Sequence, residues 1–80
     1  MIAPVTIDPA PLLAALRARK SPTPLPQVAA EIGPSAFEEF ERELAEETVV
    51  VRRGEIAAVT ATSYVRLVER IAGRNGGRLP

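Results

Sequence analysis

Residues 25–47 read LPQVAAEIGPSAFEEFERELAEE and contain two helix patterns separated by a glycine and a proline. In the first, Pro26 can open a helix, and Val28 and Ile32 lie four positions apart on one face. Gly33 can adopt the left-handed conformation that ends a helix, and the proline after it prevents the helix from continuing. We therefore expect a short helix that ends at a tight turn.

The second pattern predicts a longer, strongly acidic helix. Ser35 and Glu38 have the spacing of a capping box, so the helix is expected to begin with Ser35 as its cap. Phe37, Phe40 and Leu44 recur at i, i+3 and i+7 and predict one buried stripe. Charged residues cover the remaining surface of this helix, namely Glu38, Glu39, Glu41, Arg42, Glu43, Glu46 and Glu47.

On the N-terminal side, a helix is predicted over residues 9–19. Asp8 can cap it, with Pro9 at the first helical position, and Leu12 and Leu16 supply an apolar face. The proline-rich residues 21–26 (SPTPLP) end this helix and force an extended connection to the next.

On the C-terminal side, two short β-branched segments predict a hairpin. Residues 48–52 and 56–60 are the strands, and Gly54 permits the positive φ of a tight turn, with a loop of two or of four residues. A fourth helix follows, capped by Thr60 or Thr62 and ended by Gly73. Its expected buried face consists of Tyr64, Leu67, Val68 and Ile71.

These elements predict one small α+β domain, with about four helices and one β-hairpin. A chain of 80 residues has room for a single domain, which we place at residues 1–73. The glycine-rich residues 74–80 (RNGGRLP) are expected to form a flexible C-terminal tail.

The composition argues against most enzyme chemistry. The chain has no cysteine and no histidine, so it lacks a thiolate nucleophile, the usual general base and the commonest metal ligands. We expect no catalytic residue, no metal and no cofactor. No apolar run is longer than the five residues 12–16, far short of a membrane span, and no basic, apolar leader opens the sequence, so we expect a cytoplasmic protein without membrane contact.

The order of elements resembles a winged helix-turn-helix domain, in which the hairpin is the wing. Ala29 matches the small residue of that family's second helix, and Gly33 matches the glycine of its turn. Within the superfamily, VVVRRGEIAAV followed by TSYVRLVERI is similar to the repeated winged-helix modules of the selenocysteine-specific elongation factor. The resemblance implies binding of DNA, in the manner of a transcription regulator, or of an RNA hairpin.

The charge distribution decides which part of such a domain would bind nucleic acid. Residues 38–47 carry six glutamates against Arg42, a net charge of −5, which opposes contact between this helix and phosphates. Arg42 is also spaced to pair with Glu38 or Glu46. Residues 48–80 carry a net charge of +4. We therefore expect the hairpin to lead, with the contacts Arg52, Arg53, Arg66 and Arg70.

A protein-docking module is the alternative interpretation. The acidic third helix would then meet a basic partner, or the basic end of a second copy in a homodimer, through Glu38, Glu39, Arg42, Glu43 and Glu46. Glu39, Glu43 and Glu46 share a face that could hold a hard cation, but a solvated acidic face is the simpler interpretation. If the glutamates instead face the first two helices, Arg17, Arg19 and Lys20 are the nearest residues that could neutralise them.

Overall fold

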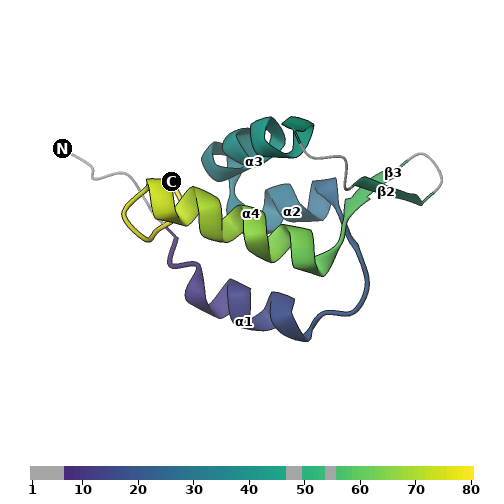
Figure 1. Cartoon of the computed structure of the whole chain (residues 1–80), viewed down its shortest axis with the longest axis horizontal. Helices are drawn as coiled ribbons and strands as arrows, with labels where there is room; N and C mark the ends of the chain where they lie inside the picture. Colours follow the sequence, from purple (N-terminus) through teal and green to yellow (C-terminus); the bar gives the residue numbers. More distant parts are fainter. Residues whose placement is uncertain (1–6, 47–49, 54–55) are drawn as a thin grey trace.

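The computed structural model describes residues 7–46, 50–53 and 56–80, and for residues 50–53 and 56 it describes the backbone alone. Four helices and a β-hairpin form a small α+β fold, which confirms the predicted fold class (Figure 1). The helices are α1 (Ala10–Ala18), α2 (Leu25–Ile32), α3 (Pro34–Glu46) and α4 (Ala61–Arg74). The strands are β1 (Thr23–Pro24), β2 (Val50–Arg53) and β3 (Ile56–Val59).

The three strands form one antiparallel sheet in the order β1-β3-β2. Arg53 pairs with Ile56, so the hairpin has a two-residue loop and the shorter of the two expected connections is the one formed. Strand β1 was not predicted, because two residues cannot show an alternating pattern. Pro24 has no N–H to donate, and it is tolerated here because β1 lies at the edge of the sheet.

Helix α4 provides the largest share of the core and packs between α1 and α3 (Figure 1). Its predicted face is confirmed, since Tyr64, Leu67, Val68 and Ile71 are all fully buried. The Tyr64 ring meets Phe40 of α3 edge to face, with 5.5 Å between ring centroids. The other helices add further fully buried side chains, namely Leu16, Val28, Ile32 and Ala36.

The start of α3 differs from the predicted capping box. Gly33 adopts a φ of 84°, as expected at the turn, and its carbonyl accepts a 2.9 Å hydrogen bond from the Phe37 amide. The helix therefore begins at Pro34 rather than after Ser35. Proline suits the first helical position because its φ is already helical and the amide it lacks would have no partner there.

The buried stripe of α3 includes Phe40 and Leu44, as predicted, but its first member is Ala36 instead of Phe37. Ala36, Phe40 and Leu44 are buried, whereas Phe37 is half-buried and stacks on Phe40 with 6.3 Å between ring centroids. Ala36 lies one turn before Phe40 on the same face of the helix, and its small side chain allows close approach to the neighbouring helices.

Of the three predicted N-terminal caps, those at Asp8 and Thr60 make a hydrogen bond at the start of their helices and the one at Ser35 does not, while Pro9 occupies the cap position of α1 itself. The Asp8 carboxylate accepts a 3.0 Å hydrogen bond from the Ala10 amide at the start of α1. Thr60, rather than Thr62, caps α4 by accepting a 3.3 Å hydrogen bond from the Ser63 amide.

Helix α4 was predicted to end at Gly73, but it continues to Arg74. The residue that reverses the chain is Gly76, with a φ of 68°, and the Gly77 amide donates a 2.7 Å hydrogen bond to the Ala72 carbonyl. This six-to-one bond with a left-handed glycine is the Schellman arrangement. A glycine in a helical pattern thus did not mark the end, because the chain offers better-placed glycines three residues later.

The expectation of a flexible tail over residues 74–80 is not what the structure shows. Leu79 is fully buried and belongs to the core. Its amide and carbonyl pair with the backbone of Ile7 in an antiparallel bridge, with N–O distances of 2.9 and 3.0 Å. Leu79 is the one large apolar side chain after Ile71, and burying it outweighs the flexibility of the preceding glycines.

Candidate functional site

The hairpin carries the residues expected to lead nucleic-acid binding. Strands β2 and β3 extend beyond the helices at one end of the molecule (Figure 1). Arg52 and Arg53 are the last two residues of β2, paired with Ala57 and Ile56, so their backbone lies next to the turn. Their side chains fall outside the described part of the structure.

The outer face of α3 is acidic and solvent-exposed. Glu38, Glu41, Arg42 and Glu46 are all exposed on it. Arg42 lies 3.6 Å from Glu38, as the four-residue spacing predicted, with more than 70% of each side chain accessible to solvent. Because one guanidinium offsets only one of the three carboxylates, this face keeps a net negative charge and repels phosphates.

The inner carboxylates of α3 face α4 instead of solvent. Glu43 accepts a 2.9 Å hydrogen bond from Arg70 and a second, short one from Arg74. Glu39 accepts hydrogen bonds from Arg74 at 3.5 Å and from the Asn75 amide group at 3.3 Å. We call this group of Glu39, Glu43, Arg70, Arg74 and Asn75 the α3–α4 ionic seam.

The seam has a measurable electrostatic consequence. Only 13% of the Glu43 side chain is accessible to solvent. Hydrogen bonds from Arg74 and then Arg70 lower the pKa of Glu43 below its usual 4.5, and the Glu43 carboxylate in turn raises the pKa of Arg74. Glu43 is therefore held as a carboxylate that bridges two guanidinium groups.

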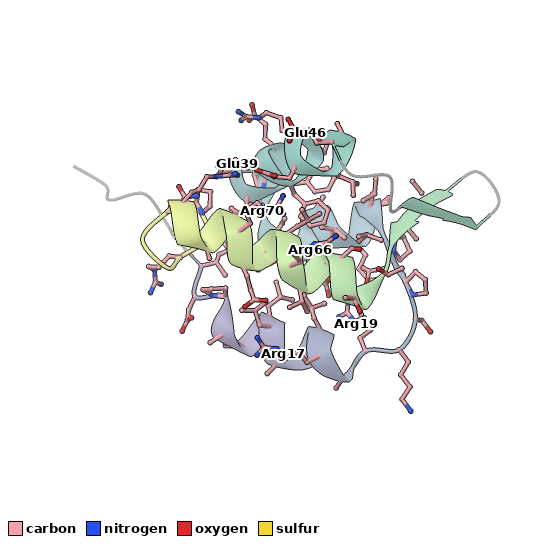
Figure 2. All side chains as sticks on the ribbon, viewed as in Figure 1. Arg17, Arg19, Glu39, Glu46, Arg66 and Arg70 are labelled. Atoms are coloured by element: carbon pink, nitrogen blue, oxygen red, sulfur yellow. The ribbon has the colours of Figure 1, made fainter. Side chains whose placement is uncertain are left out.

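Each of the two predicted sets of site residues, the nucleic-acid set and the docking set, has some members in the seam and others outside it. Of the nucleic-acid set, Arg70 is held by Glu43, and Arg66 lies exposed one turn earlier on α4 (Figure 2). Of the docking set, Glu38, Arg42 and Glu46 are on the outer face of α3, whereas Glu39 and Glu43 are in the seam. Pairing across α3 and α4 could not be found from sequence spacing, because the partners are about 30 positions apart.

Arg17 and Arg19, two of the three residues considered for neutralising the α3 glutamates, have other partners. Arg17 of α1 lies 3.7 Å from Glu69 of α4, and Lys20 is exposed. Arg19 makes a two-pronged contact with Glu31 of α2 at 2.9 and 3.2 Å. The neutralising role belongs to Arg70, which was expected to contact nucleic acid, and to Arg74.

A second polar cluster lies at the edge of the core and joins Arg19, Thr23, Glu31 and Tyr64. Arg19 also donates a 2.8 Å hydrogen bond to the buried Thr23 hydroxyl, and Tyr64 donates one of 2.9 Å to Glu31. Arg19 is the main cause that lowers the pKa of Glu31, while burial and the Glu31 carboxylate raise the pKa of Tyr64. Tyr64 is thus a core residue, as predicted, and its hydroxyl reaches a polar cluster at the edge of the core.

Across residues 7–46, 50–53 and 56–80, the structure contains no group of three or more acidic side chains placed to hold a metal ion. The cation site considered for Glu39, Glu43 and Glu46 is not formed, because two of the three bind arginines and Glu46 is exposed on the outer face. None of the described helices is both long and apolar enough to cross a bilayer.

Comparison with known proteins found no matching family model, no matching curated protein and no matching solved structure.

Proposed function

We propose that this chain is a winged-helix module that binds nucleic acid through its β2–β3 hairpin. The element order helix, strand, helix, helix, hairpin, helix, together with the Gly33 turn between α2 and α3, supports the winged-helix assignment. In such a domain the helix after the turn commonly enters the major groove. Here the outer face of that helix, α3, is acidic, which argues for the hairpin as the contact.

The observation that carries this proposal is the position of Arg52 and Arg53. They end β2 beside the turn of a hairpin that extends beyond the helices (Figure 1), and the seam engages Arg70 and Arg74 elsewhere. Two adjacent arginines at a hairpin end can bind phosphates or enter a minor groove. The contact would set position and affinity through charge, with Arg66 as the nearest addition from α4.

The test is fluorescence anisotropy with a labelled mixed-sequence DNA duplex and a labelled RNA hairpin, each at low and at physiological salt. The double variant Arg52→Ala/Arg53→Ala removes the proposed contact. The matched control Arg17→Ala/Arg42→Ala removes the same charge from α1 and α3, where both side chains are exposed.

If each arginine neutralises one phosphate, the hairpin variant reduces the slope of log affinity against log salt by about 1.8 on duplex DNA. Because neither control residue lies on the hairpin, the control variant changes that slope much less than the hairpin variant does. Equal affinity of the hairpin variant and the unaltered chain would remove the hairpin from the proposal, and the nucleic acid bound more tightly would identify the class of target.

Docking of a basic protein on the outer face of α3 is the second candidate. Glu38, Glu41 and Glu46 are exposed there and lie outside the seam. Such a face favours a partner with complementary positive charge. Substituting these three glutamates by glutamine distinguishes docking through α3 from nucleic-acid binding through the hairpin.

A further inference from the structure

A cavity of about 290 Å³ lies between the C-terminal half of α1 and the first two turns of α4. It is lined by Leu16, Arg17, Arg19, Ala61, Thr62 and Val65. Pockets that hold drug-sized ligands measure about 300–1,000 Å³. This cavity therefore accepts one or two side chains of a partner rather than a large cofactor.

The base of the cavity is apolar. Leu16 is fully buried, and Ala61 and Val65 are half-buried at its edge. These three side chains belong to two different helices that pack directly against each other, so the surface they form is held by the core. An apolar side chain seated there would remove the remaining exposed area of Ala61 and Val65 from water.

The rim of the cavity is positively charged. Arg19 is fixed by Glu31 and Thr23, and 24% of its side chain remains accessible. Arg17 is 60% accessible and lies 3.7 Å from Glu69, a weak surface pair that a ligand can displace. Figure 2 shows Arg17 and Arg19 on the α1 side of α4, whereas Glu39 and Glu46 lie on its α3 side.

The start of α4 adds to this positive character. Ala61 and Thr62 are its first two residues and line the cavity, and the first turn contains no acidic side chain. The Thr60 hydroxyl accepts a hydrogen bond from the Ser63 amide, and the Thr60 carbonyl accepts one from the Tyr64 amide. The Ala61 and Thr62 amides therefore lie at the end of the helix. The partial positive charge of a helix start thus lies beside two guanidinium groups.

We propose that this cavity docks an acidic peptide segment of a partner protein. One apolar side chain of the segment rests on Leu16, Ala61 and Val65, and its flanking carboxylates lie against Arg17, Arg19 and the start of α4. The proposal rests on the α1–α4 cavity alone and is independent of nucleic-acid binding by the hairpin. It joins an apolar base with a cationic rim, and the charge of that rim selects the occupant.

The test is an NMR titration of the ¹⁵N-labelled chain with an acetylated and amidated pentapeptide that has a central leucine and glutamates at its other positions. Two matched peptides replace either the leucine by alanine or the glutamates by lysines. We expect the amide signals of Leu16, Ala61, Thr62 and Val65 to shift with the first peptide, less with the alanine peptide and not with the lysine peptide. Absence of shifts at these residues, or equal shifts with all three peptides, would overturn the proposal.

Two variants and a competitor complete the design. Arg17→Gln weakens binding of the acidic peptide about two- to fivefold, since an exposed charge contributes little. Arg42→Gln on α3 is the matched control and leaves binding unchanged. The RNA hairpin used above is titrated in parallel. If it shifts the cavity signals at a lower concentration than the acidic peptide does, the cavity is a phosphate site and the peptide assignment is wrong.

Discussion

Arg70 of α4 donates a 2.9 Å hydrogen bond to Glu43 of α3. A residue predicted to contact nucleic acid therefore joins two helices of the fold. The same carboxylate also accepts from Arg74. Opposite charges that lie in separate acidic and basic segments of the sequence therefore meet across α3 and α4. The outer face of α3, the hairpin and the cavity beside α1 lie outside these pairs.

The first prediction concerns acid stability. The pKa values of Glu31 and Glu43 are both lowered, so these carboxylates bind protons less readily in the folded than in the unfolded chain. Their contribution to stability is fully present above about pH 4.5, the unfolded value, and is lost as the pH falls through the lowered folded pKa values. Urea unfolding at pH 7, 5, 4 and 3 should show stability falling over the acid part of this range.

Glu43→Gln isolates the contribution of the seam. It should lower the thermal midpoint at pH 7 and make the acid loss smaller, with up to about one proton fewer taken up on unfolding. Glu41→Gln is the matched control, because Glu41 is exposed on α3 and outside the seam. An acid loss that is the same in Glu43→Gln and in the unaltered chain would contradict the role given to Glu43.

The second prediction concerns Phe40, whose ring is fully buried against Tyr64. Phe40→Ala should reduce the free energy of unfolding by about 3–5 kcal/mol. Because domains of this size are marginally stable, that loss removes much of the total. Phe37→Ala, at the half-buried neighbour, should cost clearly less. Chemical denaturation followed by circular dichroism measures both, and equal losses would refute the observed register of α3.

The sequence was most informative where one helix face is apolar over several turns. Tyr64, Leu67, Val68 and Ile71 were predicted together, because a continuous stripe has only one face to bury. Local caps at Asp8 and Thr60 were also predicted, since they depend on neighbouring residues alone. The pairing of Glu43 with Arg70, and of Glu31 with Arg19 and Tyr64, depends on how helices pack and leaves no periodic signal.

The helix end at Gly76 and the burial of Leu79 also depend on tertiary packing, which is why the sequence did not predict them. Three glycines near α4 each permit a helix end, and the choice of Gly76 over Gly73 depends on where Leu79 must reach to enter the core. A single apolar residue after a glycine-rich segment has no pattern around it. Its burial is decided by the space left between the helices and by the bridge to Ile7.

The third prediction tests that burial. Leu79→Ala should destabilise the fold by about 2–5 kcal/mol, as truncation of a fully buried leucine does. Arg78→Ala, at the exposed neighbour, should cost much less. Thermal unfolding of the two variants compares them directly. If both midpoints equal that of the unaltered chain, Leu79 is not part of the core in solution.

The fourth prediction separates nucleic-acid binding from protein docking. The triple variant Glu38→Gln/Glu41→Gln/Glu46→Gln removes the negative charge of the outer face of α3 and leaves the seam intact. If the hairpin binds nucleic acid, relief of repulsion should tighten binding several-fold at low salt, with a smaller gain at physiological salt because screening already weakens that repulsion.

A docking module would behave in the opposite way, because the carboxylates that attract a basic partner would be gone. The measurement uses the same labelled DNA and RNA as above, with a poly-lysine peptide as the probe for docking. The control Glu69→Gln removes a carboxylate from α4, away from the outer face of α3. Unchanged nucleic-acid affinity together with lost binding of the basic peptide would favour docking through α3 over binding through the hairpin. Tighter nucleic-acid binding that Arg52→Ala/Arg53→Ala then abolishes would assign the contact to the hairpin, because both substitutions lie in β2.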